Sequence, residues 1–470
     1  MESDPVVAVQ HASSNQGATA VAAPPAGLSQ ADFLRMLFRL LDEHKVHYCV
    51  LHSWQGLPDN LPSDLDLAVH PRDQVKLASV FRALASAGYR PVQHWHQGEG
   101  HTFYFVWFEP QGMRSAMVDI NAEYREGGLK MMRAEDMVLG RRPVNGFWIA
   151  DPAVEFTYLL VKKTLKGSLP ERQSTRLKNL ASEIGDPQAE KIAGDLFGKR
   201  WKERVLQACK GGRLGALLPA LKQRIWLVAL AKDPFTPLRR LVQEAPRLVR
   251  RALRPIGLFL VILGPDGVGK STLVGRLAES LTHAAFDRFR IFHWRPMVIA
   301  PQKEAGVVVT DPHDEPPRGM LGSIAALFGV LLDYWLGWGL VLRPFLTRRG
   351  LVIFDRYFHD LLIDPIRYRY GGPMWFARFM GRFVPPPDMM FLVLDAEDQV
   401  IFSRKREVLP QELQRQRAGY HQFCTADKRA ALIATDKGVE RTLEEANRLV
   451  VQYLAERFER RNPRWLATDD

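Results

Sequence analysis

The stretch "LVILGPDGVGKST", Leu260–Thr272, decides how the second half of this 470-residue chain folds. It satisfies the pattern G-x-x-x-x-G-K-[ST], in which glycines let backbone N–H groups approach phosphate oxygens. The lysine of this pattern reaches the β- and γ-phosphates, and the serine hydroxyl ligates Mg²⁺. An apolar strand leads in, and the amphipathic "LVGRLAESL" turns its N-terminus toward the phosphates. The predicted phosphate-binding residues are Gly264, Pro265, Asp266, Gly267, Val268, Gly269, Lys270, Ser271 and Thr272.

Around this loop, strands alternate with helical segments from Ile256 to about Phe458. Five apolar runs have the length and composition of buried strands: "LFLVILG", "RFRIFHW", "GLVIFD", "MMFLVLD" and "ALIATD". Strands separated by helices form βαβ units and a parallel sheet. The fold class is therefore α/β, with a five-stranded parallel sheet in the C-terminal part.

The third of these strands ends in "LVIFDRYFHD", which carries a candidate catalytic pair. Asp355 falls at the carboxyl edge of the sheet, beside the phosphate loop. It could bind Mg²⁺ or accept a proton from the substrate. Arg356 would hold an anionic substrate group through two hydrogen bonds. The alternative is a strand-end aspartate that merely caps the next helix.

The loop with Asp266, the "DRY" at Asp355–Tyr357, "VLDA" on the fourth strand and the basic "SRKREV" together resemble the thymidylate kinase-like branch of P-loop kinases. The likeness covers about Leu258 to Leu454. It implies an enzyme that uses ATP and Mg²⁺. It also implies that Asp355 and Arg356 serve the substrate and the metal, with Ser271 as the other metal ligand. Arg404 and Arg406 match the arginines of a mobile lid, which bring positive charge to the transferring phosphoryl group.

The sequence departs from this family around the acceptor. "FHWRP" (292–296) precedes a long apolar stretch, and "RYRY" (367–370) places basic and aromatic residues together. Such a cluster suits a phosphate plus a ring, although ordinary surface residues would look the same. The candidate substrate contacts are Asp266, Arg295, Arg356, Tyr357, Arg367 and Arg369. Nothing in the sequence selects thymine.

The front half carries a second, weaker motif. Asp64 and Asp66 alternate along a strand and so share a face, and Asp119 lies on a later strand. Three such carboxylates can hold Mg²⁺ on a triphosphate. The pattern resembles the nucleotidyltransferase superfamily over about Phe33 to Tyr124. It departs at His52–Ser53, where that superfamily has Gly-Ser, which puts nucleotide binding in doubt.

The excess positive charge lies between the two halves. The segment 199–254 holds fifteen Lys and Arg against three acids, an excess equal to the net charge of the whole chain, +12. Prolines divide the later part of this segment into short amphipathic pieces. It could contact an anionic membrane, follow nucleic-acid phosphates, or form a solvated linker. The linker is the favoured interpretation, and nucleic acid is the least favoured of the three.

The stretch "MLGSIAALFGVLLDYWLGWGLVLRPF" is long and apolar enough to span a membrane. Asp333 near its middle and its place between two strands of one sheet argue for one or two buried helices instead. Met1–Gly27 has the composition of a disordered tail and not of a signal peptide. Three scattered cysteines fit a reducing compartment, so we expect a cytoplasmic protein, with the inner membrane face as a peripheral option.

The sequence thus predicts a disordered tail (1–28), a small α/β nucleotidyltransferase-like domain (29–150), a helical region (151–211), a basic Pro-broken linker (212–255) and a thymidylate kinase-like domain (256–470). The favoured function is phosphoryl transfer to a nucleoside monophosphate. Three alternatives stay open: a sugar or glycolipid acceptor in surface polysaccharide assembly, nucleic-acid end processing, and a non-catalytic nucleotide-gated switch. A homodimer is a further option.

Overall fold

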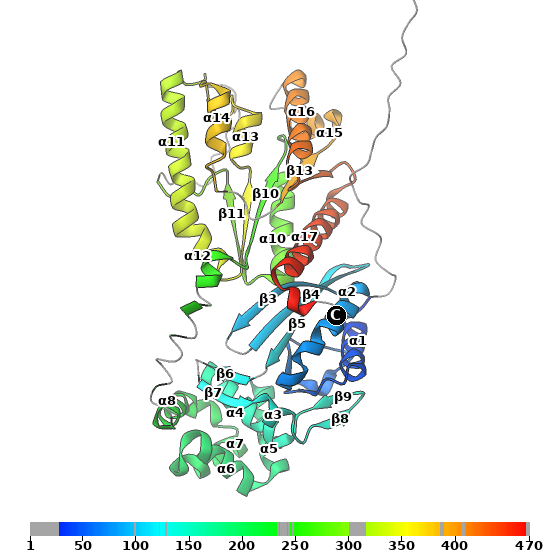
Figure 1. Cartoon of the computed structure of the whole chain (residues 1–470), viewed down its shortest axis with the longest axis vertical. Helices are drawn as coiled ribbons and strands as arrows, with labels where there is room; N and C mark the ends of the chain where they lie inside the picture. The colour runs from blue at the N-terminus through cyan, green and yellow to red at the C-terminus, as the bar shows by residue number, and fades with distance from the viewer. Residues whose placement is uncertain are drawn as a thin grey trace, which may run out of the picture.

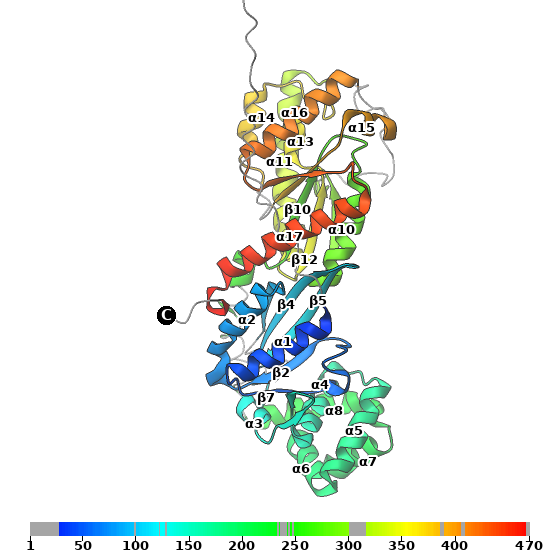
Figure 2. The ribbon, with the colours of Figure 1, turned by 90° about the vertical axis from the view of Figure 1, so that its right-hand side faces the viewer.

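The computed structural model describes residues 28–97, 100–121, 123–126, 129–232, 235, 242, 245–246, 249–299, 316–385, 390–405 and 409–466. The expected disordered tail therefore lies, apart from Leu28, outside the described residues. Figures 1 and 2 show three bodies stacked along the long axis of the molecule. They are a helical unit, an N-terminal domain built on a mixed sheet, and a C-terminal α/β domain.

The N-terminal domain is a seven-stranded mixed sheet in the order β3-β4-β5-β2-β1-β9-β8. Helices α1 (Gln30–Glu43) and α2 (Leu77–Ser86) cover one face. The predicted strand with Asp64 and Asp66 corresponds to β2, which begins just after Asp64, and the predicted strand with Asp119 is β5. The strands are β1 (Tyr48–Val50), β2 (Leu65–Val69), β3 (Arg90–Gln97), β4 (Gly100–Glu109), β5 (Gly112–Asn121), β8 (Arg142–Val144) and β9 (Phe147–Ile149), with β6 (Glu123–Glu126) and β7 (Leu129–Arg133) as a separate ribbon.

The C-terminal domain has the five-stranded parallel sheet that the sequence predicts, in the order β11-β12-β10-β13-β14. Its strands are β10 (Leu258–Leu263), β11 (Arg288–His293), β12 (Gly350–Asp355), β13 (Phe391–Asp395) and β14 (Ala430–Ala434). One face packs on α10 (Lys270–Ala285) and α17 (Val439–Arg461). The remaining helices are α11 (Met320–Gly337), α12 (Arg343–Leu346), α13 (Phe358–Ile363), α14 (Met374–Gly381), α15 (Asp398–Arg404) and α16 (Pro410–Ala426).

The two domains share a core. Alternate residues of β4 point to opposite sides, so Phe103 and Phe105 pack on α1 and α2 while Tyr104 and Val106 pack on α10 and α17. The C-terminal end of the chain also returns to the N-terminal domain, because Trp465, which follows α17, is buried in the core of that domain. The C-terminal domain is therefore not an independent unit on a flexible linker.

The helical unit extends further than the sequence predicts. It contains α3 (Ala134–Val138), α4 (Pro152–Lys166), α5 (Glu171–Ile184), α6 (Asp186–Phe197), α7 (Lys202–Lys210) and α8 (Leu214–Lys232). Helix α8 was expected to belong to a Pro-broken linker, but Leu214, Leu218 and Leu221 are buried in the same cluster as α4–α7. Pro219 is accommodated inside this helix.

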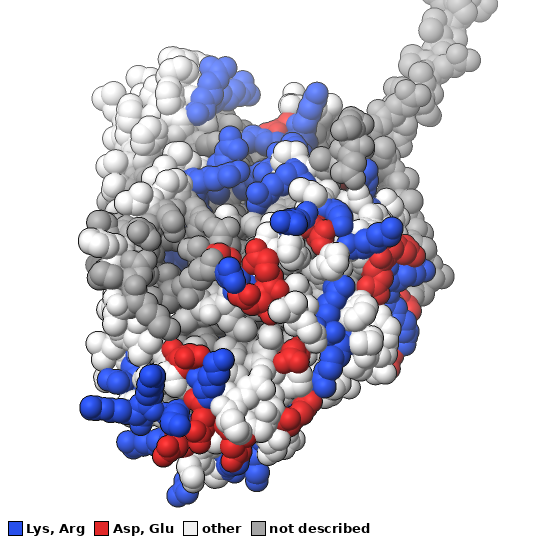
Figure 3. Space-filling model, turned by 60° about the horizontal axis from the view of Figure 1, so that its bottom comes forward, with Lys and Arg blue, Asp and Glu red and all other residues white. Residues whose placement is uncertain are grey.

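The basic segment 199–254 accordingly does not form one uniform cationic surface over its described part. Lys202 pairs with Glu190, and Lys210 pairs with Asp186, both on α6. Figure 3 brings the bottom of the molecule toward the viewer and shows Lys and Arg side chains interspersed with Asp and Glu. Arg239, Arg240 and Arg247 lie outside the described residues, so the membrane and nucleic-acid interpretations of that stretch stay untested.

The apolar stretch at 320–346 is a nearly continuous helix formed by α11, a π turn at Trp338–Leu342 and α12. The expectation of a buried helix is only half correct, because 28% of Met320–Leu346 is buried. Asp333 is on the buried side, where it accepts hydrogen bonds from the backbone of Met297, Val298 and Ile299. By length and composition alone, Leu214–Ala231 in α8 is a second helix that could cross a membrane.

We predict that Trp465→Ala destabilises the whole molecule by about 3 kcal/mol, since it removes a large ring from a core. Its ring packs edge-on against Phe103. Chemical denaturation followed by circular dichroism and by a probe in each domain would measure the change. Trp375→Ala is the matched control, because that ring is 69% exposed and its loss should cost less than about 0.5 kcal/mol. A loss of N-terminal structure with an unchanged C-terminal transition would contradict the shared core.

Candidate active site

The loop between β10 and α10 lies at the carboxyl edge of the parallel sheet. Gly264 has φ +142°, and a Cβ there would come within 2.5 Å of the Leu394 carbonyl oxygen. Gly267 has φ +81°, and a Cβ would lie 3.1 Å from the Ile401 carbonyl oxygen. Both positions need glycine because the neighbouring strand and helix α15 press directly on the loop. The fold therefore sets the shape of the loop between β10 and α10.

The side chain of Lys270 folds back over this loop. Its Nζ donates to the carbonyl oxygens of Gly264 and Pro265, each at 2.8 Å, and lies 3.2 Å from Asp266 Oδ1. Burial, reinforced by the charge of Arg356, lowers the pKa of Lys270 to about 8. The ammonium is thus held inside the protein at a cost that a bound anion would offset.

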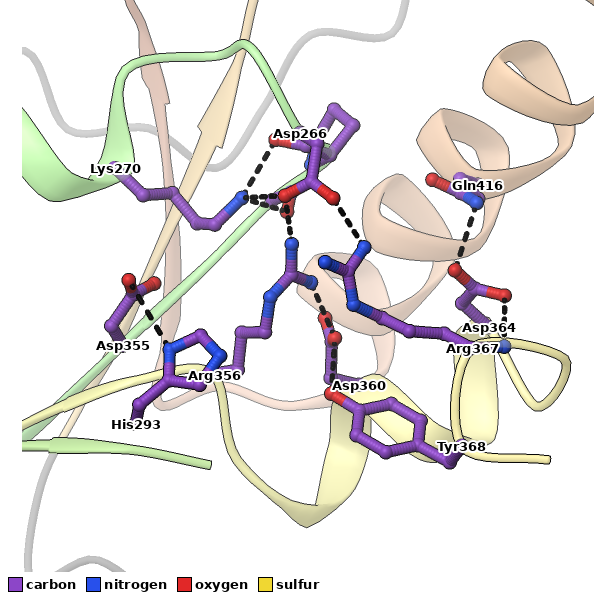
Figure 4. A network of polar contacts seen from close by, with 12 residues as sticks. Asp266, Lys270, His293, Asp355, Arg356, Asp360, Asp364, Arg367, Tyr368 and Gln416 are labelled. Carbon is purple, nitrogen blue, oxygen red and sulfur yellow. Dashed lines mark hydrogen bonds and ion pairs between the residues drawn. The ribbon is translucent and has the colours of Figure 1, made fainter. Parts of the chain in front are cut away.

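Asp266 is the centre of the charge network at the site. Figure 4 shows its carboxylate between Lys270, Arg356 and Arg367. Oδ1 pairs with Arg356, and Oδ2 pairs with Arg367. Three cations from the loop, from the end of β12 and from the segment after α13 therefore converge on one carboxylate. Asp266, Lys270, Arg356 and Arg367, which the sequence assigns to one candidate site, therefore lie together in the structure.

Arg356 is held from several sides. It adopts a left-handed backbone conformation with φ +76°, and its N–H donates to the Ile262 carbonyl oxygen at 3.0 Å. Its side chain pairs with Asp360 at 2.5 Å. Tyr368 and Tyr420 donate their hydroxyls to the same Asp360 carboxylate. Burial alone would raise the pKa of Asp360, but the charge of Arg356 and the two hydroxyls lower it, so the pair stays charged.

Asp355 has one oxygen engaged and one oxygen unused. Its Oδ2 lies 3.6 Å from His293 Nδ1, whereas Oδ1 is buried without a hydrogen-bond partner. Burial raises the pKa of this carboxyl, but the nearby His293 and the charge of Lys270 outweigh that effect and lower the pKa. An ionised carboxylate with an unsatisfied buried oxygen is the donor that a divalent cation requires.

Two aromatic rings lie next to this network. Trp294 and Tyr368 have ring centroids 4.4 Å apart. Trp294 Nε1 and Arg295 Nε are buried, and neither has a hydrogen-bond partner in the part of the chain that the structure describes. Arg295 otherwise lies 3.7 Å from Asp333 and over the Trp294 ring. These groups offer a flat surface and two N–H donors beside the arginines.

Four further predicted residues differ in where they lie. Arg404 lies against the loop, with NH1 at 3.5 Å from the Val268 carbonyl oxygen. Ser271 and Thr272 are exposed at the start of α10. Arg406 lies outside the described residues.

Two predicted substrate contacts are placed elsewhere. Tyr357 is buried in the core beside Phe259 and Tyr334, and its hydroxyl donates to the Pro385 carbonyl oxygen at 2.5 Å. Its ring therefore belongs to the core of the C-terminal domain and not to the group around Asp266. Arg369 donates through Nε to the Pro316 carbonyl oxygen, away from Asp266.

Sequence reasoning missed the groups that position the site. Arg417 on α16 makes two hydrogen bonds to Asp395, at 2.7 and 2.9 Å, and His421 adds a third at 2.8 Å. Asp360 and Tyr420 were missed in the same way. Asp395 ends a strand beside the loop and could have been suspected from that position. Its partners on α16 follow it by more than twenty residues and carry no local signal.

The second predicted site is also assembled. Asp66 pairs in register with Asp119 across β2 and β5, so both side chains share a face. Asp64 joins them, and the three carboxylates offer oxygens within 4.8 Å of one another. Burial and the charge of Asp66 raise the pKa of Asp119, whose Oδ1 is buried without a hydrogen-bond partner. The grouping is therefore the one that the sequence predicts.

The central carboxylate of this group is already saturated. Lys162 Nζ lies 2.8 Å and His52 Nε2 lies 2.7 Å from Asp66 Oδ2, while Tyr158 donates to Oδ1 at 2.8 Å. Burial alone would raise the pKa of Asp66, but the contacts with Lys162 and His52 outweigh the effect of burial, so the pKa is lowered. His52, which departs from the Gly-Ser pattern, is one of these partners. Lys162 thus neutralises the central carboxylate of the group, where a metal ion would otherwise do so.

The comparisons with known proteins bear on part of the chain. No family model matches it. A curated thymidylate kinase from Xanthomonas euvesicatoria pv. vesicatoria is 27% identical over 143 residues, which cover 30% of this chain. The chain spans only 58% of the length of that relative. A solved thymidylate kinase structure from Ehrlichia chaffeensis is 15% identical and covers 41% of this chain and 98% of its own, with a TM-score of 0.29.

The similarity to the curated kinase is weak and covers only part of this chain. It supports in part the resemblance drawn from the loop and "DRY". The nucleotidyltransferase-like interpretation of the N-terminal domain and the order of the domains receive no support from these comparisons.

We predict that Asp119→Asn stabilises the protein at pH 8 by on the order of 1–3 kcal/mol. The raised pKa means that the folded carboxyl holds its proton where the unfolded one has lost it. Stability therefore falls as pH rises from about 4 to about 6 and stays lower above that window. Thermal unfolding of both proteins at pH 4 and pH 8 would show a gap only at the higher pH.

The same unfolding experiment also tests whether Asp64, Asp66 and Asp119 bind Mg²⁺. With Lys162 at Asp66, added Mg²⁺ should leave the unfolding of both proteins unchanged at pH 8. A Mg²⁺-dependent stabilisation of the wild type that Asp119→Asn lacks would show instead that the three aspartates bind the cation.

Proposed function

We propose that the C-terminal domain is an ATP- and Mg²⁺-dependent phosphotransferase whose acceptor is a nucleoside monophosphate. One observation carries the proposal: Lys270, Arg356 and Arg367 converge on the Asp266 carboxylate at the carboxyl edge of a parallel sheet. Ligands of open α/β sheets bind at this edge. Phosphoryl transfer needs such converging positive charge and little covalent chemistry from the protein.

The loop Gly264–Thr272 would hold the donor phosphates as a P-loop does, with the N-terminus of α10 toward them. Lys270 would exchange its carbonyl partners for phosphate oxygens. Ser271 and the free oxygen of Asp355 are the residues that would hold Mg²⁺. When bound, the ion neutralises charge on the transferring phosphoryl group. Arg404, which already lies against the loop, would add positive charge from α15.

The acceptor would be held by the arginines that Asp266 now engages. A phosphate dianion carries more charge than one carboxylate and accepts two hydrogen bonds from each guanidinium. Arg356 and Arg367 would therefore transfer from Asp266 to the acceptor phosphate. Trp294 and Tyr368 offer the flat surface on which a base would stack, with the Nε1 of Trp294 as a hydrogen-bond donor.

A sugar or glycolipid acceptor is the second candidate. The observation that favours it is the exposed apolar face of α11 and α14, since an acceptor carried by a lipid would be presented at such a surface. The aromatic pair beside the arginines suits a sugar ring as well as a base. Nucleic-acid end processing and a non-catalytic switch remain alternative outcomes of the tests below.

In the N-terminal domain the likeness to nucleotidyltransferases is supported by the pairing of Asp66 with Asp119 on neighbouring strands. The pairing of Asp66 with Lys162 argues that this cluster is neutralised by the protein itself. We therefore derive no transfer step for it.

We predict that screening acceptors with labelled ATP yields transfer to a nucleoside monophosphate, with sugars, glycolipids and nucleic-acid ends tested in parallel. Arg367→Ala should raise the KM for the acceptor by about tenfold or more, because a charged hydrogen bond is lost. Arg369→Ala is the matched control, since that side chain points to Pro316 and should change KM by no more than about twofold. Transfer to another acceptor class would replace the proposed substrate. If no class of acceptor led to ATP consumption, the non-catalytic nucleotide-gated switch would be the remaining interpretation.

We predict that the affinity for ADP is constant below pH 8 and falls above it, by up to about tenfold per pH unit. Lys270, with its pKa near 8, is charged below that value, whereas above it the free protein must take up a proton to bind phosphate. Calorimetric titration at pH 7.5 and pH 9.5 would measure the change. Lys270→Arg keeps its charge over this range, so its affinity should not depend on pH. A wild-type affinity that is equal at both pH values would refute the role of Lys270.

A further inference from the structure

Helices α11 and α14 lie on the outer side of the C-terminal domain, at the upper left of Figure 1, and both carry exposed apolar side chains. The exposed side chains of α11 and its continuation recur at helical spacing, so they form one stripe. Those of α14 and the turn after it lie alongside. The exposed apolar residues are Met320, Leu321, Phe328, Leu332, Trp335, Leu336, Leu340, Trp375, Phe379 and Phe383.

The two helices form one continuous surface. Phe328 on α11 and Phe376 on α14 have ring centroids 6.1 Å apart. Trp335 Nε1 donates to the Phe383 carbonyl oxygen at 2.7 Å, which joins α11 to the turn that follows α14. A contiguous patch of this kind on a folded protein marks a binding surface and not a set of scattered apolar residues.

Among the described residues of the segment that carries this surface, the exposed charges are of one sign. Within residues 316–385, four exposed arginines flank the two helices: Arg318, Arg348, Arg378 and Arg382. All four acids of that range point inward: Asp333, Asp355, Asp360 and Asp364. An apolar stripe with tryptophans and a cationic border is the composition of a segment that lies in the interface of an anionic bilayer.

A cavity opens at the lower end of the same surface. Its volume is about 990 Å³, and Trp335 and Phe383 belong both to its wall and to the exposed stripe. Phe259 and Trp338 supply further apolar wall. Five arginines line it as well: Arg254, Arg382, Arg429, Arg460 and Arg461. A hollow that combines aromatic walls with several guanidinium groups suits a chain of hydrocarbon that ends in an anionic group.

We propose that this α11–α14 surface docks on an anionic lipid bilayer and that the adjoining cavity receives an anionic lipid from it. Docking places the stripe in the bilayer interface without moving the helix. A span by α11 would instead withdraw Asp333 from the backbone N–H groups of Met297, Val298 and Ile299, which are its buried partners. A second copy of the chain would bring the arginines of two identical surfaces together without opposing acids, which disfavours that occupant.

Flotation of the full-length protein with phosphatidylcholine vesicles, with and without phosphatidylglycerol, tests this proposal. We expect binding to the vesicles that contain phosphatidylglycerol. Leu321→Glu combined with Trp375→Glu should weaken it by about tenfold or more, and Arg378→Gln with Arg382→Gln should remove its dependence on the anionic lipid. The control is Leu139→Glu combined with Val75→Glu, which changes two residues of equal exposure in the N-terminal domain and should leave binding unaltered.

Circular dichroism and light scattering complete the test. The substituted side chains point to solvent, so folding should be retained; if the double variant unfolds, Leu321→Ser alone is used. Equal binding to neutral and anionic vesicles, or equal loss in the control variant, would overturn the proposal. So would a dimer that Leu321→Glu dissociates in the absence of vesicle binding. Flotation needs no turnover, so it is independent of the proposed phosphotransferase.

Discussion

Burial of β4 on both faces is the constraint on which the arrangement of the molecule depends. An antiparallel strand with one wet face would alternate apolar and polar residues. The run "FYFVWF" does not alternate, because Phe103 and Phe105 face α1 and α2 while Tyr104 and Val106 face the C-terminal domain. If the domains separated, the second face of this sheet would meet water. The free energy of that exposure holds the two halves together, and Arg349 over the Tyr104 ring, at 4.2 Å, lies across the same boundary.

Helix α10 connects this boundary to the candidate active site. Its first residue is Lys270, and its body packs against β4 and β5 of the N-terminal domain. Strand β5 in turn carries Asp119. The two acidic sites therefore rest on elements that touch each other. Any displacement of the loop that moved α10 as a rigid helix would have to disturb the packing on β5, so the N-terminal domain acts as a support for the loop.

The sequence predicted the elements that carry local signals. The parallel sheet, the glycine loop and the strand-end Asp355 all follow from periodicity or from a motif of a few residues. The placement of Asp66 and Asp119 on neighbouring strands follows from alternation and from their order along the chain. In each case the physics is short-range, so a window of ten to twenty residues contains it.

What could not be predicted depends on contacts between distant segments. The sequence places Asp266 and Arg367 among the candidate substrate contacts, but it does not indicate that the two side chains, more than a hundred residues apart, pair with each other. Tyr357 was placed in the site by its motif, but its ring belongs to the core, because the direction of a side chain after a strand depends on one residue of register. The apolar helix α11 was taken as buried, since composition shows that a helix has apolar residues but not how many of its faces find partners.

A comparison of the groups around Asp66 and Asp266 explains why we propose phosphoryl transfer only at Asp266. Each aspartate is neutralised by cations of the protein, yet the Asp66 side chain is 2% exposed and the Asp266 side chain is 17% exposed. Lys162, His52 and Tyr158 around Asp66 are buried with it, so exchanging them for a ligand would leave a buried charge unpaired. Around the more exposed Asp266, the proposed phosphate would take over both guanidinium groups and leave them paired. The partners of the carboxylate would therefore be exchangeable at Asp266 and not at Asp66.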